Sequence, residues 1–184
     1  MSKLYFRYGV VSSAKTLNLL ATLHNYESQG KYAILLKPLL DTRTVNVESR
    51  AGLSHKPDLL VNIDTEIGKS IDGLFGNASA ILVDEVQFLT SSQIKDLRHI
   101  SLFHDIPVIC YGLRTKSDGE LWESIITLMA IADSIEEIKT TCFYCNKKAI
   151  FSKAIDNNNE LGDIINPTWD GYIPVCANHY YGIS

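Results

Sequence analysis

Three cysteines and one histidine near the C-terminal end have the residue types and spacing of metal ligands. Cys142 and Cys145 are separated by two residues, and Cys176 and His179 repeat that gap. Such a gap lets both side chains of a pair reach one tetrahedral ion, and three thiolates with one imidazole fill all four positions. The set therefore predicts a closed, structural Zn²⁺ site, with residues 146–175 as a loop tied at its base.

Other interpretations of these residues stay open. Disulfides are disfavoured, because the composition is typical of an intracellular chain, in which thiols stay reduced. A redox C-x-x-C motif accounts for neither Cys176 nor His179, and His179 could instead be a tail histidine. The fourth cysteine, Cys110, lies in the apolar run PVICYG and is expected to be a buried small hydrophobe.

A segment near the N-terminus has the spacing of a phosphate-binding loop, G-x-x-x-x-G-K-[ST]. It follows a predicted strand and opens a predicted helix, whose N-terminal N–H groups would face the phosphates. Lys15 would reach the β- and γ-phosphates, and the Thr16 hydroxyl would ligate Mg²⁺. Alone, the segment could equally be a turn with a surface lysine. The predicted ATP-binding residues are Gly9, Val10, Val11, Ser12, Ser13, Ala14, Lys15 and Thr16.

Ala14 stands where this pattern has its second glycine. Glycine lets the backbone take unusual angles and approach the phosphates closely. Alanine adds a methyl group, and a left-handed conformation costs it about 1–2 kcal/mol.

A pair of carboxylates supplies the other half of a nucleotide site. Asp84 and Glu85 follow the apolar residues 80–83, so they lie at the end of a buried strand. A carboxylate at such a strand end, next to the phosphate loop, suits a hydrated Mg²⁺. Because consecutive side chains leave on opposite faces, Asp84 can face the metal while Glu85 faces a substrate hydroxyl as its base. In isolation, the pair could be a solvated loop mouth.

The elements that position these residues predict an α/β fold. Apolar runs without alternation are separated by helical patterns, which indicates a parallel sheet covered on both faces. From about residue 140 the sequence consists of short β-like segments, turns and the remaining cysteines. We therefore expect a phosphate-loop nucleotide-binding domain over 1–139 and a zinc-bound β domain over 140–184. Strands are expected at 3–8, 32–36, 58–61, 80–85 and 107–112, helices at about 17–30, 63–75, 91–103 and 120–132, and a long loop at 41–57.

Composition narrows the class of protein. The chain has 184 residues, 46% apolar and 21% charged, with a net charge of −4, which excludes collagen-like and strongly disordered chains. No cluster of basic residues is present, so a nucleic-acid partner is not expected. No apolar stretch approaches membrane-spanning length, and the N-terminus lacks the features of a signal peptide. A soluble, cytoplasmic protein without a membrane partner is expected.

The order of these pieces resembles the type II thymidine kinases, the zinc-containing cytosolic family, in their bacterial form. The resemblance covers nearly the whole chain, and VDEVQFLT and CYGLRT are its most specific pieces. The matching segments are the phosphate loop, DTR at 41–43, SRAGLS at 49–54, ILVDEVQFL at 81–89, VICYGLRT at 108–115, the C-x-x-C pair and VCANH.

The resemblance implies a RecA-like core and a zinc-bound module whose lasso loop closes over the nucleoside. It implies transfer of the ATP γ-phosphate to the thymidine 5′-hydroxyl to give dTMP, with deoxyuridine a possible substrate, in a homotetramer. Glu85 would be the base and Asp84 would lie near Mg²⁺, whereas Gln87, Asp41 and Arg43 would border the phosphates. The implied nucleoside-binding positions are Leu113, Ser117, Ser152, Ile165, Asn166, Pro167 and Tyr172.

Three departures from the family pattern support an alternative function. Ala14 replaces the loop glycine, and Ser117 replaces a phenylalanine that stacks on the base, a contact worth of order 1 kcal/mol. Pro167 and Thr168 stand where the lasso has a glycine pair. The alternative is a catalytically weakened or silent nucleotide-binding relative. A zinc-ribbon nucleic-acid binder is a third class, and it needs a basic face that the sequence lacks.

Overall fold

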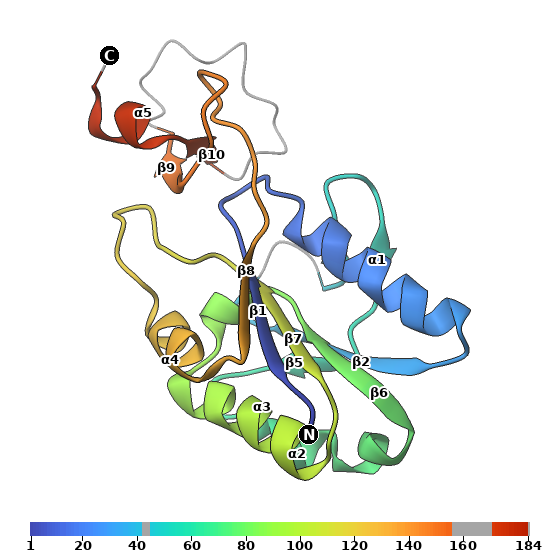
Figure 1. Cartoon of the computed structure of the whole chain (residues 1–184). Helices are drawn as coiled ribbons and strands as arrows, with labels where there is room; N and C mark the ends of the chain where they lie inside the picture. The colour runs from blue at the N-terminus through green and yellow to red at the C-terminus, as the bar shows by residue number, and fades with distance from the viewer. Residues whose placement is uncertain (42–44, 156–170, 184) are drawn as a thin grey trace.

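A computed structural model describes residues 1–41, 45–155 and 171–183. Its centre is a sheet of six strands in which every hydrogen-bonded pair is parallel (Figure 1). The strands are β1 (Leu4–Tyr8), β2 (Tyr32–Pro38), β5 (Leu59–Val61), β6 (Ala78–Val83), β7 (Val108–Gly112) and β8 (Ser134–Glu137). Their spatial order is β5-β2-β6-β7-β1-β8, so β7 separates the strand before the phosphate loop from the strand before Asp84.

Helices cover both faces of this sheet, as the sequence predicts (Figure 1). The helix α1 (Lys15–Ser28) packs Leu19 and Leu23 on one face, against Leu35 and Leu82. The other face carries a larger apolar cluster to which the remaining helices of the core contribute. These are α2 (Ile67–Ser70), α3 (Ser91–Phe103) and α4 (Glu123–Ile131), with the 3₁₀ turns η1 (Asp72–Asn77) and η2 (Val86–Phe88).

Two expected elements differ in the structure. The helix expected over 63–75 is only α2 followed by η1; glycines at 68, 73 and 76 weaken an α-helix there, and Ile63 is exposed. The expected loop at 41–57 contains a short antiparallel hairpin, β3 (Val47–Glu48) and β4 (Ser54–His55).

The strand β8 was not predicted from the sequence. This strand pairs with β1 at the edge of the sheet and shows no fully buried residue. An edge strand can be short and polar because only one side of it pairs, so it lacks the apolar run of a buried strand.

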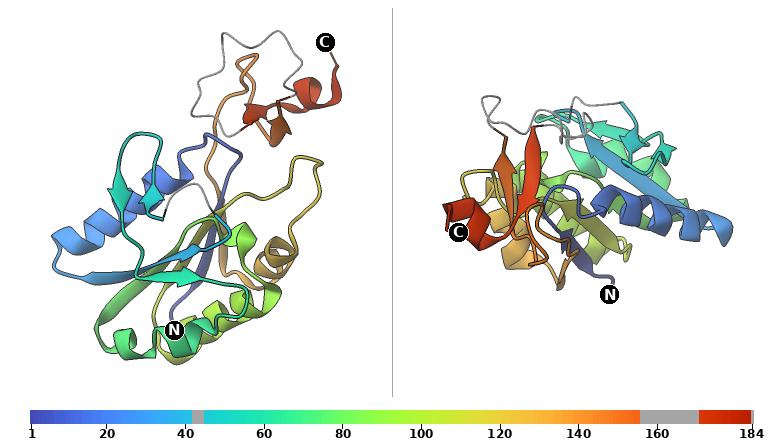
Figure 2. Two further views of the ribbon diagram at one scale, coloured as in Figure 1. Left: turned by 180° about the vertical axis from the view of Figure 1, so that it is seen from behind. Right: turned by 90° about the horizontal axis from the view of Figure 1, so that it is seen from above.

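The C-terminal residues form a small module over the carboxyl ends of the strands (Figure 2). It contains the antiparallel pair β9 (Phe151–Ala154) and β10 (Tyr172–Val175), and the helix α5 (Ala177–Tyr181). A separate apolar cluster, in which Ile173 and Val175 are buried beside Cys142 and Cys176, forms its core. The boundary near residue 140, between 1–139 and 140–184, stays a prediction.

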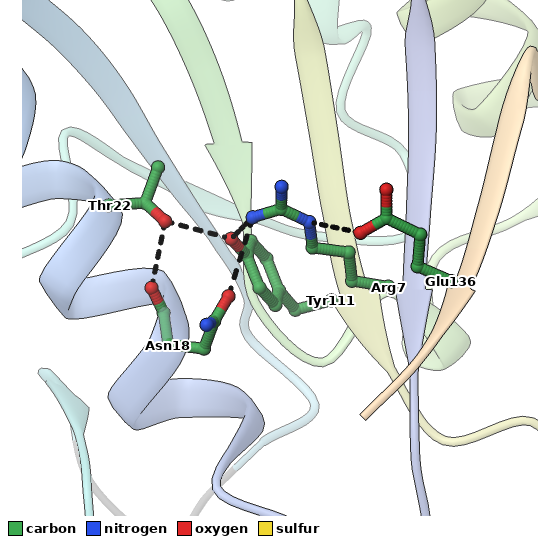
Figure 3. A network of polar contacts seen from close by, with 5 residues as sticks. All are labelled: Arg7, Asn18, Thr22, Tyr111 and Glu136. Atoms are coloured by element: carbon green, nitrogen blue, oxygen red, sulfur yellow. Dashed lines mark hydrogen bonds and ion pairs between the residues drawn. The ribbon is translucent and has the colours of Figure 1, made fainter. Parts of the chain in front are cut away.

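A polar network fixes α1 to the sheet (Figure 3). The buried Tyr111 of β7 accepts a hydrogen bond from Arg7 Nη1 at 2.8 Å and lies 3.1 Å from Thr22 Oγ1. Arg7 also pairs with Glu136 of β8 at 3.2 Å and donates to Asn18 at 3.4 Å. The network therefore links three strands to the helix that follows the phosphate loop.

Replacing Tyr111 with phenylalanine should lower the free energy of unfolding by about 1–2 kcal/mol, because the part-buried Arg7 and Thr22 groups lose their shared partner. Urea denaturation measures this change. Tyr181→Phe, at an exposed position of α5, is the matched control and should be neutral. Equal midpoints for wild type and Tyr111→Phe would show that the network does not stabilise the fold.

Candidate active site

The phosphate loop and Glu85 meet at one cavity of about 640 Å³, whereas Asp84 lies outside the cavity lining. The cavity opens at the carboxyl ends of the parallel strands, where α/β sheets bind ligands. Four regions supply its walls: the phosphate loop, the end of β2 with the β3–β4 hairpin, the segment after β6, and single residues of the β7 end and β10. The lining residues are Val11, Ser12, Ser13, Ala14, Lys15, Thr16, Leu17, Leu40, Asp41, Glu48, Ser49, Arg50, Ala51, Glu85, Gln87, Phe88, Leu113 and Tyr172.

The phosphate loop has the backbone of a ligand cradle. Ser12 (φ 59°) and Ala14 (φ 63°, ψ 28°) both take the left-handed conformation, and Ala14 immediately precedes α1. At Gly9, a Cβ atom would lie 2.2 Å from Ser13 Oγ and 2.6 Å from the carbonyl of Ile138, so only glycine fits. Ser13 Oγ is buried beside Gly9 and has no hydrogen-bond partner among the described residues.

Ala14→Gly should stabilise the protein, because the strain of about 1–2 kcal/mol in left-handed alanine exceeds glycine's entropic cost of about 0.5–1 kcal/mol. We expect a rise in Tm of about 2–4 °C and tighter ATP binding. The same substitution at Ala21, an exposed position inside α1, is the control and should lower Tm. A lower Tm for Ala14→Gly would show that the left-handed backbone of Ala14 does not destabilise the protein.

Lys15 and Thr16 stand where α1 begins. Lys15 Nζ donates to the carbonyl of Val10 at 2.8 Å, so its ammonium group lies over the loop. Thr16 Oγ1 contacts both carboxylate oxygens of Asp84, at 3.3 and 3.4 Å. Thr16 and Asp84, each of which the sequence assigns to Mg²⁺, thus lie in contact, although β7 lies between their strands. A hydroxyl and a carboxylate are hard oxygen donors, and this donor set fits Mg²⁺.

Glu85 faces the cavity from a constrained position. Its backbone is left-handed (φ 46°), and its side chain is buried. Gln87 Nε2 donates to Glu85 Oε2 at 2.6 Å, while Gln87 Oε1 accepts from the backbone N–H of Leu113 at 3.0 Å. The Gln87 side chain therefore orients the Glu85 carboxylate from the end of β7.

Gly112 makes this arrangement possible, because a Cβ there would lie 2.5 Å from Gln87 Oε1. Gln87 was expected to border the phosphate-side pocket, and it does line the cavity. Its contact with Glu85 was not foreseen, since it depends on a strand distant in sequence.

Arg50 is a cavity residue to which sequence reasoning assigned no role. It lies in the β3–β4 hairpin, and its Nη1 donates to Ser12 Oγ of the phosphate loop at 2.7 Å. The SRAGLS segment was part of the family resemblance. The arginine within it could therefore have been proposed as a residue of the phosphate site. Asp41 lines the same cavity, as expected, and forms an ion pair of 3.1 Å with Lys37.

The expected nucleoside-binding residues are only partly brought together. Leu113 and Tyr172 line the cavity. Ser152 does not; its Oγ accepts from the backbone N–H of Val11 at 3.1 Å and so links the C-terminal module to the phosphate loop. Ser117 also lies outside the lining, and its carbonyl accepts from Tyr180 Oη at 2.7 Å. Arg43, Ile165, Asn166 and Pro167 lie outside the described residues.

The four predicted metal ligands converge. The candidate ligand atoms of Cys142, Cys145, Cys176 and His179 all lie within 4.8 Å of one another, and His179 Nδ1 is 3.3 Å from the sulfurs of Cys142 and Cys176. Although burial opposes ionisation, hydrogen bonds from the backbone of Cys176 and Tyr144 lower the pKa of Cys142 to about 6. The site therefore favours a thiolate, and the set is compatible with structural zinc.

A parallel sheet whose phosphate loop shares one cavity with the strand-end Glu85, and whose loop threonine contacts Asp84, defines a P-loop nucleotide-binding protein. The family model described as Thymidine kinase matches residues 2–180, and the chain belongs to that family.

Curated relatives match nearly end to end. The thymidine kinase of Streptococcus gordonii is 36% identical, over 98% of this chain and 97% of that protein. Thymidine kinases of Streptococcus agalactiae and Streptococcus pyogenes are 37% and 38% identical, each over 98% of both chains. Among solved structures, two Pif1 helicase structures, one of them Bacteroides Pif1 bound to ssDNA, match 74% of this chain and 39% and 38% of theirs. Their identities are 14% and 19% and their TM-scores 0.42 and 0.41, too low to bear on function.

Proposed function

We propose that this protein is an ATP-dependent thymidine kinase that transfers the γ-phosphate of ATP to the 5′-hydroxyl of thymidine, giving dTMP and ADP. The observation that carries the proposal is the shared cavity, in which Lys15 of the phosphate loop and the Glu85 carboxylate both face one space. The family's thymidine kinases support the choice of substrate.

The chain's own groups divide the work of phosphoryl transfer. The loop N–H groups and Lys15 bind the triphosphate and offset its charge, after the ammonium group leaves the Val10 carbonyl. Thr16 and Asp84 are the residues that would hold Mg²⁺, which supplies charge neutralisation on the phosphates when bound. Glu85, oriented by Gln87, accepts the proton from the attacking 5′-hydroxyl.

The nucleoside half of the site is proposed on a narrower basis. Leu113, Phe88 and Tyr172 give the cavity an apolar wall suited to a pyrimidine. Arg43 is proposed at the phosphates, and Ser117, Ser152, Ile165, Asn166 and Pro167 at the nucleoside, from the family resemblance. Deoxyuridine, which lacks only the thymine methyl group, is a second candidate substrate, because one methyl discriminates weakly.

A nucleoside panel tests the proposal. Purified, metal-analysed protein is assayed with ATP and Mg²⁺ against thymidine, deoxyuridine and the other deoxynucleosides. Phosphorylation of thymidine, with the purine nucleosides inert, is the expected result. Binding of thymidine without turnover would support the alternative, a catalytically silent relative, which the replacement of the loop glycine by Ala14 favours.

We also propose that the Cys₃His set binds structural Zn²⁺. Cys176→Ser should lose the metal and lower Tm by about 5 °C or more, because loss of a metal is among the large destabilising changes. Elemental analysis and calorimetry measure both effects. Cys110→Ala removes a thiol outside the set and should keep the zinc. A wild-type protein that purifies without zinc would contradict this assignment.

The homotetramer and the cytoplasmic location stay proposals drawn from the family resemblance. Light scattering on the purified protein tests the first. Within the described ranges, no helix combines the length and apolar character needed to cross a membrane.

A further inference from the structure

We infer that Lys37 is a positioning residue of the phosphate site: its ammonium group holds both Asp41 and the β3–β4 hairpin against the cavity. Lys37 lies near the end of β2 and is only 1% exposed. Lysine is almost never buried to this degree unless it is paired, because desolvation of the charge is costly. A buried lysine beside the proposed triphosphate cavity is therefore expected to have a specific role. The inference rests on the proposed function, through the triphosphate that the cavity would hold.

Two contacts of Lys37 Nζ join segments that are separate in the chain. The nitrogen lies 3.1 Å from Asp41 Oδ2, with both side chains almost fully buried, and it donates to the carbonyl of Asn46 at 2.8 Å. Asp41 lines the cavity, whereas Lys37 does not. Lys37 therefore acts on the site through its partners rather than by touching the substrate.

The contact with Asn46 reaches further into the site. Asn46 directly precedes β3, and Val47 is wholly buried in the cluster that includes α1. The hairpin that starts here carries Arg50, whose guanidinium group reaches Ser12 of the phosphate loop at 2.7 Å. One buried ammonium group thus fixes an anion, Asp41, and the base of the hairpin that presents a cation, Arg50, on the same wall.

The positive charge of Lys37, and not only the packing of its side chain, is needed at this position. Without the ammonium group, the buried Asp41 carboxylate loses a compensating charge, so it is driven to take up a proton or to turn toward solvent. The Asn46 carbonyl loses a donor at the same time, which loosens the hairpin entry. Both changes disorganise the wall that faces the phosphates.

A double-mutant cycle separates positioning from stability. Lys37→Met keeps the length of the side chain without its charge, Asp41→Asn removes the partner charge, and the third variant carries both. MgATP binding is measured by calorimetry without nucleoside, and Tm is measured alongside. We expect Lys37→Met to weaken MgATP binding about tenfold or more and to lower Tm. The double variant should regain Tm, since the Lys37 ammonium group and the Asp41 carboxylate are removed together, but it should not regain the affinity for MgATP.

A purely structural lysine would give another pattern. Recovery of both Tm and MgATP affinity in the double variant would overturn the inference, as would wild-type affinity in Lys37→Met. If Lys37→Met does not fold, the double variant carries the test: an affinity for MgATP below that of the wild type supports positioning, and wild-type affinity refutes it.

The control is Lys31→Met, which removes an exposed charge immediately before β2 and should leave MgATP binding unchanged. Thymidine phosphorylation by the wild type is assayed separately. A wild type that binds MgATP but phosphorylates no nucleoside would refute the proposed function. The double-mutant cycle would still test the role of Lys37, because it measures only MgATP binding.

Discussion

Replacing Glu85 with glutamine should lower kcat for thymidine phosphorylation by about 10²–10⁴-fold, the usual contribution of a positioned general base. The substitution keeps the size of the side chain and leaves an oxygen that can accept the hydrogen bond of Gln87. The KM values for ATP and thymidine should change little, since the lost interaction belongs to proton transfer. Steady-state kinetics on wild type and variant provide the measurement.

Glu66→Gln is the matched control for this prediction, because Glu66 is exposed and lies outside the cavity. Its kinetics should equal those of the wild type. If Glu85→Gln kept a kcat within about twofold of wild type, far less than a general base contributes, Glu85 would not be the base.

Replacing Lys15 with methionine should lower kcat/KM for ATP by about 10²–10³-fold, the usual effect of removing one preorganised charge-stabilising group. The loop backbone should survive, because methionine keeps the length of the stem and Ala14 and Ser12 set the turn. Calorimetry on MgATP and steady-state kinetics should show both weaker binding and slower turnover.

The control for Lys15 is Lys95→Met, which removes an exposed charge on α3 and should be silent. Unchanged ATP kinetics in Lys15→Met would mean that the phosphates bind elsewhere.

Much of this site follows from local pattern. The spacing around Lys15 predicted a loop before a helix, and Ala14 was expected to bear the strain of a left-handed residue, which it does. Thr16 and Asp84 both come after strands of the parallel sheet, and the carboxyl ends of such strands lie at one edge. Their contact is therefore consistent with the predicted fold. The Cys₃His set was also predictable from local pattern, because the two-residue gap within each pair brings both side chains of that pair to one ion.

Contacts set by tertiary structure could not be predicted in this way. Gln87 orients Glu85 through the end of β7, and Arg50 reaches Ser12 across the cavity. The Leu113 N–H that holds Gln87 and the Ser12 hydroxyl that Arg50 contacts are distant from these residues in the sequence, so no local spacing reveals either contact. The edge strand β8 was missed for a related reason, since its polar residues pair on only one side and carry no apolar signal.

The central claim is that the lysine-bearing loop and Glu85 serve one transfer. A crystal structure with a bisubstrate analogue, in which a tetraphosphate joins the 5′-oxygens of adenosine and thymidine, tests it most directly. We predict phosphates along residues 9–16 with Lys15 on the β- and γ-positions, and the thymidine 5′-oxygen within about 3 Å of the Glu85 carboxylate. Phosphates bound away from the loop, or a 5′-oxygen remote from Glu85, would contradict the account.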